Sequence, residues 1–219
     1  MSINKTTKVV CPSCKKEFEV VFWDSINADL DPEAKQELLK GGLFNQKCEH
    51  CGESGVVLYP VLYHDMSNKA MVYFVADINT VDSVREDIEA VRGKADGIDN
   101  DSMSDYKFRI VTDHNELREK ALIFDNGLDD RVIEMIKILF SNAILKEKFD
   151  TEQMRIYFDV EENQYAFVLL RKNGEVSAWN LDKDFYDSIA SEYGDIIEQN
   201  SKNEYFINNQ WATSLFAEE

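Results

Sequence analysis

Hydrophobic and polar positions in the first third of the chain follow the pattern of short strands joined by tight turns. The stretches 8–10 and 18–23 are apolar or alternating and flank a short turn, which predicts a hairpin. Further strands are predicted at 43–47, 56–63 and 70–76. We therefore expect a small antiparallel sheet in this region.

Helical patterns interrupt and follow these strands. Asp31 and Pro32 have the form of a helix start, as a cap and a first helical residue, and that helix would end at Gly41. Residues 116–124 and 131–146 predict a helical pair. Apolar residues cover most of the second member of this pair, so we expect it to be a buried central helix.

Alternation returns after residue 150. Three strands of an antiparallel meander are predicted at 154–160, 165–171 and 175–181. Asn173-Gly174 between the last two is a strong two-residue hairpin turn. A helix is predicted at 184–193, and the aromatic segment 205–216 would add a strand or pack against the meander.

These elements predict an α+β fold in two domains. Residues 1–148 would form a zinc-ribbon-like, metal-clamped antiparallel sheet with the helical pair, and residues 149–219 the meander with its helix. The segment 93–104 is acidic and rich in Gly, Asp, Asn and Ser, and predicts a flexible linker or long insertion.

The cysteines carry the clearest chemistry in the chain. All four belong to two Cys-x-x-Cys pairs, formed by Cys11, Cys14, Cys48 and Cys51. Two such turns facing each other supply the four sulfur ligands of a tetrahedral metal site, which predicts structural zinc, although iron suits the same cage. Redox chemistry is less favoured. A thioredoxin-like pair lies between a strand and a helix, whereas both pairs of this chain are expected at hairpins.

Residues within and beside these pairs support the same interpretation. Pro12 fixes the backbone after the first ligand, and Gly52 relieves the tight turn after Cys51. His50 could replace a neighbouring cysteine as a ligand. With four sulfurs already present, we expect it to face solvent.

Net charge narrows the classes of partner. The chain carries −18, of which −16 lies in residues 76–219, while residues 1–75 hold 8 basic and 10 acidic side chains. This negative charge repels the phosphate backbones of nucleic acids and attracts basic proteins. The first residues are polar and predict no signal peptide, and thiols reserved for metal fit the reducing cytosol, so we expect a cytoplasmic protein without a membrane segment.

The two cysteine pairs, taken together with the segments 109–120 and 127–134, resemble the CpXC family, which is named for paired Cys-Pro-x-Cys motifs. The resemblance covers about residues 5–146. It implies a metal-binding domain and implies no activity. Glu49 stands where the family has the proline of the second pair, which leaves all four cysteines in place.

Few other residues suggest a reaction centre. His114 with Asp113 and Glu116 has the composition of a carboxylate–imidazole site, although a helix start collects the same residues for capping. A hidden active site, if there is one, is expected where four acidic residues would line one groove, namely Glu119, Asp129, Asp130 and Glu134. No nucleophile triad, phosphate loop or dinucleotide fingerprint is present in the sequence, so an enzyme is not indicated.

The leading hypothesis is therefore a non-catalytic, zinc-stabilised module that binds a protein partner. One alternative is a nucleic-acid-associated zinc-ribbon protein. The lysines near the cysteine pairs favour it, namely Lys5, Lys8, Lys15, Lys16, Lys40 and Lys47. Another alternative is an acidic inhibitor or immunity-type protein that covers a basic surface of a toxin or nuclease.

Overall fold

The computed structural model of the 219-residue chain describes residues 2–94, 103–142 and 154–216. The chain divides into two compact units, Met1–Ala121 and Leu122–Glu219. The fold is α+β, as predicted. The boundary expected at 148/149 and most of the linker expected at 93–104 lie outside the described residues.

The first unit is built on a five-stranded sheet in the order β1-β2-β5-β6-β7. Its strands are β1 (Ile3–Val10), β2 (Glu17–Asn27), β5 (Val61–Asp65), β6 (Ala70–Phe74) and β7 (Lys107–Val111). The β1–β2 and β5–β6 pairs are antiparallel, whereas β2–β5 and β6–β7 are parallel. The expectation of a wholly antiparallel sheet is therefore wrong, because crossovers through α1 and α2 return the chain in the same direction.

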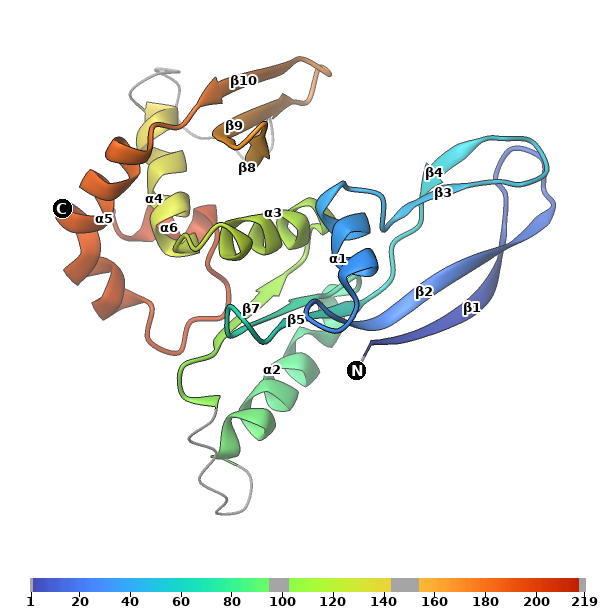
Figure 1. Cartoon of the computed structure of the whole chain (residues 1–219), viewed down its shortest axis with the longest axis horizontal. Helices are drawn as coiled ribbons and strands as arrows, with labels where there is room; N and C mark the ends of the chain where they lie inside the picture. The colour runs from blue at the N-terminus through green and yellow to red at the C-terminus, as the bar shows by residue number, and fades with distance from the viewer. Residues whose placement is uncertain (1, 95–102, 143–153, 217–219) are drawn as a thin grey trace. The chain divides into compact units, whose positions relative to one another are not determined.

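Strand β2 takes part both in the main sheet and in a two-stranded extension of it. Only Ser25–Asn27 pairs with β5, and the preceding residues pair with β1 alone as a long two-stranded arm (Figure 1). A second sheet, made of β3 (Asn45–Lys47) and β4 (Ser54–Val56), runs beside this arm. The single strand predicted at 56–63 is wrong, since Pro60 has no N–H for a ladder and separates β4 from β5.

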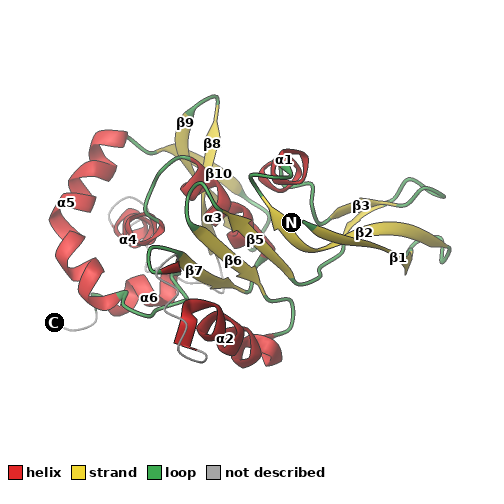
Figure 2. Cartoon of the chain, turned by 60° about the horizontal axis from the view of Figure 1, so that its bottom comes forward, coloured by secondary structure: helices red, strands yellow, loops and turns green. Residues whose placement is uncertain are grey.

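Two helices lie on opposite sides of the main sheet, α1 (Pro32–Leu39) and α2 (Val81–Glu89) (Figure 2). The Asp31 carboxylate accepts the Ala34 N–H at 3.3 Å, so the predicted cap of α1 is confirmed. Two short helical turns, η1 (Ile78–Thr80) and η2 (Ala90–Lys94), flank α2. The next helix, α3 (His114–Asp125), begins in the first unit and ends in the second.

The second unit combines helices with the predicted meander, which is confirmed in the order β10-β9-β8. Its elements are α4 (Asp130–Phe140), β8 (Met154–Glu161), β9 (Gln164–Arg171), β10 (Val176–Asn180), α5 (Lys183–Asn200) and α6 (Asn209–Ser214). Phe140 of α4 packs on Phe167 and Trp179, with ring centroids 5.7 and 5.2 Å away. The segment 205–216 contains the helix α6 and no strand, so the strand predicted there as one of two possibilities is wrong.

Among the described residues, no helix combines the length and apolar character that crossing a membrane requires.

Candidate metal centre

Both cysteine pairs lie in turns at hairpin tips, one between β1 and β2 and the other between β3 and β4. The two turns have the same backbone pattern, in which the first cysteine donates its N–H to the carbonyl five residues later. That cysteine also accepts the N–H of the fourth following residue. The bonds are Cys11 N to Lys16 O at 2.9 Å, Lys15 N to Cys11 O at 3.0 Å, Cys48 N to Glu53 O and Gly52 N to Cys48 O, both at 2.8 Å.

This shared turn requires a left-handed residue directly after the second cysteine. Gly52 has φ of +76°, which fits the role predicted for it. The equivalent position in the first turn is Lys15, with φ of +62°. A side chain is strained in that conformation, and the sequence alone does not reveal that Lys15 is the counterpart of Gly52.

The four sulfur atoms come together between the two turns, all within 4.8 Å of one another. The shortest separations join different turns, at 3.6 Å for Cys11–Cys51 and 3.7 Å for Cys14–Cys48. A disulfide would hold its sulfurs about 2.05 Å apart. Tetrahedral zinc with bonds of about 2.3 Å sets sulfur–sulfur distances of about 3.8 Å, so the donor set and spacing fit one such ion.

Exposure and ionisation differ among the four thiols. Cys11 and Cys48 are buried, whereas Cys51 is exposed. The Cys14 N–H, aided by other donors, lowers the pKa of Cys11 to about 7. The Glu53 N–H also favours the Cys51 thiolate, but desolvation and the three neighbouring sulfurs outweigh it and raise the pKa of Cys51 to about 12. The Cys11 thiol is therefore the more readily ionised of these two, and the neighbouring sulfurs oppose ionisation of Cys51 when no cation is bound.

A small apolar cluster supports the site from the side of the arm. Phe18 and Val20 of β2 pack with Cys11 and Cys48, and all four side chains are buried. His50 lies apart from the four-sulfur cluster, and its Nε2–H donates to the Glu17 carbonyl at 2.8 Å. His50 therefore joins the second turn to the start of β2.

An apolar groove of about 110 Å³ opens beside the cysteines, between the end of β1 and β4. Val9, Phe18 and Val57 contribute to its lining. Val10 and Val56 also line it and are 60% and 52% exposed, which is high for residues of their size. The groove is a candidate contact surface rather than part of the folded core.

The contacts of His114, at the start of α3, serve packing and helix capping. The His114 ring packs edge-on against Phe44, with centroids 5.7 Å apart. Asp113 Oδ1 lies 3.5 Å from His114 Nδ1 and accepts the Asn115 N–H at 2.8 Å. These contacts are those of a helix cap, and they favour capping over a carboxylate–imidazole site.

Three of the four acidic residues expected to line one groove are buried, which contradicts that expectation. Glu119, Asp130 and Glu134 are 1%, 0% and 2% exposed, so they face no open surface. Glu134 pairs with the equally buried Lys137 at 3.1 Å. Asp129 caps α4 by accepting the Arg131 N–H at 2.9 Å, and its carboxylate raises the pKa of the Arg131 guanidinium.

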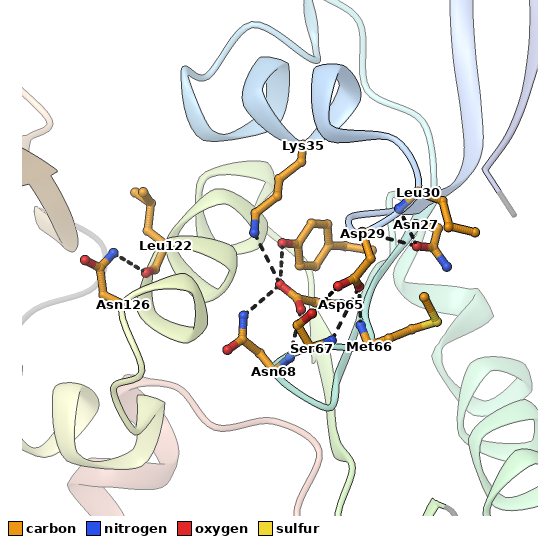
Figure 3. Close-up of polar contacts among 11 residues, drawn as sticks. Asn27, Asp29, Leu30, Lys35, Asp65, Met66, Ser67, Asn68, Leu122 and Asn126 are labelled. Carbon is orange, nitrogen blue, oxygen red and sulfur yellow. Dashed lines mark hydrogen bonds and ion pairs between the residues drawn. The ribbon is translucent and has the colours of Figure 1, made fainter.

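Sequence reasoning missed a polar cluster around Asp65, at the end of β5 (Figure 3). This buried carboxylate accepts hydrogen bonds from Tyr63 Oη at 3.1 Å and from Asn68 N and Nδ2 at 2.9 and 3.0 Å. Lys35 of α1 lies 3.6 Å away and supplies a positive charge. The residue sits in a stretch that reads only as a polar hairpin loop, and nothing in that pattern indicates burial.

A second carboxylate, Asp29, fastens the same loop. It accepts the Met66 N–H at 2.7 Å, the Ser67 N–H at 3.4 Å and the Ser67 hydroxyl. The Ser67 hydroxyl, followed by the two backbone donors, lowers the pKa of Asp29. Together Asp29 and Asp65 hold α1 and its preceding loop on the β5–β6 hairpin, which is a structural role.

Comparison with known proteins agrees with the cysteine pattern. A family model described as CpXC protein matches residues 9–137, which include both cysteine pairs, the main sheet apart from most of β1, and most of α4. No curated protein and no solved structure matches the chain.

Proposed function

Since the chain belongs to the CpXC family, we propose that Cys11, Cys14, Cys48 and Cys51 bind one structural zinc ion, and that the arm they close is a non-catalytic protein-interaction element of a cytoplasmic protein. The cluster of four sulfurs within 4.8 Å carries this proposal. Four protein ligands complete a tetrahedral shell, whereas catalytic zinc keeps one position for water or substrate. The two facing turns also make the centre similar to a zinc ribbon.

The β3–β4 hairpin needs such an ion because it has little core of its own. Each strand has three residues, and in this sheet only Gln46 is even half-buried. A two-stranded hairpin of this length is marginal in water. Zinc binding supplies folding free energy where apolar burial does not.

The groove beside the cysteines supports the interaction role. Val10 and Val56 remain exposed at its rim, and β1 is an edge strand of the described sheet. An apolar groove next to an open strand edge suits an extended segment of a protein partner. Nucleic acid is disfavoured, because Lys8, Lys15, Lys16 and Lys47 act within a chain of net charge −18.

Replacing one ligand tests the zinc proposal. Cys14→Ser should lose the single zinc ion measured by inductively coupled plasma mass spectrometry. Amide exchange should rise across 45–56 and stay slow across 61–74, because only the β3–β4 hairpin depends on the clamp. Ser13→Ala, in the same turn but outside the sulfur cluster, is the matched control and should retain both zinc and protection.

A full equivalent of zinc and unchanged exchange in Cys14→Ser would contradict the structural clamp. The interaction role has a separate test in Val56→Ser, which should weaken capture of a partner that wild type retains. Val21→Ser is its control, since Val21 is 45% exposed on the arm but does not line the groove. Equal capture by both variants would exclude the groove as the contact surface.

A further inference from the structure

One face of helix α5 packs against the rest of the second unit. Tyr186, Ile189 and Ile197 are buried, and the helix packs against α4. Tyr186 Oη accepts the Asp129 N–H at 2.8 Å at the start of α4. Arg131 of α4 donates to Glu198 at 2.8 Å and to Ser201 at 2.7 Å, near the other end of α5. The helix is therefore held at both ends.

Two large apolar side chains of α5 stay outside this packing. Phe185 is 45% exposed and Ile196 is 37% exposed. They are eleven residues apart, which is close to three helical turns, so they lie along one side of the helix about 16 Å from each other. Glu192 falls between them on the same side, at seven residues from Phe185. Each side chain therefore keeps more than a third of its surface open to solvent.

The exposed side of α5 is strongly acidic as well. The helix contains five acidic residues and one basic residue, Lys183. Lys183 is paired with Asp187, and Glu198 with Arg131. The other acidic side chains of α5, Asp184, Glu192 and Asp195, form no ion pair within the described residues, and all three are exposed. This face therefore has two apolar side chains bordered by acidic side chains without ion pairs. A partner that fits it would carry apolar side chains flanked by basic ones.

We propose that the Phe185–Ile196 side of α5 binds a basic amphipathic helix of another protein. Such a helix would place two apolar side chains about 16 Å apart against Phe185 and Ile196. Its lysines or arginines would meet Glu192, Asp195 and Asp184. Nucleic acids and anionic membranes carry the wrong sign for this face, and a second copy of the chain would bring the same negative charge toward it.

This inference goes beyond the zinc proposal, because α5 lies in the other unit and includes no cysteine. It gives a specific role to part of the acidic excess of the chain. Negative charge spread over the surface would act only through long-range attraction. The apolar pair adds contacts that depend on position and that salt does not screen.

The test uses the full zinc-loaded chain and a fluorescent synthetic helix that carries lysines and two leucines three turns apart. Fluorescence anisotropy measures its affinity at low and physiological salt. Phe185→Ser/Ile196→Ser should weaken binding about tenfold or more at both salt concentrations, since each truncation removes a buried apolar contact. Glu192→Lys/Asp195→Lys should weaken it by a similar factor, chiefly at low salt.

The matched control is Glu161→Lys/Glu162→Lys, which changes the charge equally at the exposed β8–β9 turn of the same unit. It should alter the affinity by about threefold or less. The same loss in this control and in Glu192→Lys/Asp195→Lys would show that net charge alone attracts the probe, and would overturn the proposal. Unchanged binding by Phe185→Ser/Ile196→Ser would do so too.

Melting temperatures of all variants report whether the unit remains folded. A variant that melts more than a few degrees below wild type is replaced by Phe185→Leu/Ile196→Gln, which retains more of the helix surface. Zinc content should be the same in every variant. Loss of the α5 interaction with full zinc content separates failure of this proposal from failure of the zinc clamp.

Discussion

Substituting the glycine of the second cysteine turn measures how far backbone conformation contributes to metal binding. Gly52 has φ of +76°, and a Cβ added there would meet only Lys47 Cε, at an ordinary 3.9 Å. Gly52→Ala therefore introduces backbone strain without a clash. That strain is about 1–2 kcal/mol for an L-residue in the left-handed region. Because the turn folds around the ion, zinc affinity should fall about 5- to 30-fold.

A competition titration with a chromophoric zinc chelator gives this affinity directly. Gly55→Ala is the control, since its Cβ would find no atom within 4 Å and its backbone has no positive φ. Lys15→Gly removes the strain of the equivalent position and should strengthen binding, by up to about fivefold. An unchanged affinity for Gly52→Ala, or an equal loss for Gly55→Ala, would refute the reasoning that the turn needs an unstrained left-handed residue after its second cysteine.

Two further predictions concern the polar cluster of the first unit. Asp65→Ala should lower the free energy of unfolding by about 3–5 kcal/mol in urea titrations, because Lys35 loses its buried counter-charge, and Asp65→Ala/Lys35→Met should recover part of that loss. The lowered pKa of Asp29 contributes stability that is present above its ordinary value of 3.8 and is lost as the pH falls through the folded value. Ser67→Ala should therefore flatten the acid limb of a pH–stability curve between about pH 5 and pH 2, and an unaltered limb would exclude this linkage.

Local patterns in the sequence predict most of the elements but not how the sheet is assembled. The cap of α1 and the β5–β6 hairpin depend on neighbouring residues, and the structure contains both. The two-residue turn predicted at Asn173-Gly174 is wrong in detail, because three residues separate Arg171 from Glu175 and of these only Gly174 has positive φ. Parallel pairing of β2 with β5 depends on residues far apart in the chain. Alternation alone is the same for either direction, so the mixed sheet could not be predicted.

The candidate site shows the same division between local and long-range information. Cys-x-x-Cys spacing is local, and it correctly predicted two turns that bring four sulfurs together. The closest sulfur pairs join different turns, which no spacing rule specifies. Asp65 was missed for a related reason: its burial depends on Lys35 and α1, thirty residues earlier in the chain. Its neighbours in sequence are those of an ordinary polar loop.

The arm is held by different interactions at its two ends, and this limits what the metal can control. At its base, Phe22 of β2 stacks on Tyr59 at 4.3 Å, and Phe44 contacts both Tyr59 at 5.1 Å and Phe74 of the main sheet at 5.2 Å. These aromatic contacts join the β3–β4 segment to the sheet without any ion. At the tip, the four sulfurs, a small apolar cluster and the His50–Glu17 hydrogen bond do so.

The apolar groove lies at the cysteine end of the arm, among residues that the aromatic cluster does not reach. Losing the metal should therefore release β4 from β1 and open the groove, while the base of the arm stays attached to the sheet. Metal occupancy would then determine the shape of the contact surface rather than whether the arm is folded onto the domain. A partner that requires the closed groove should bind the zinc-loaded chain and not the chelated one, even though α1, β5 and β6 remain folded in both.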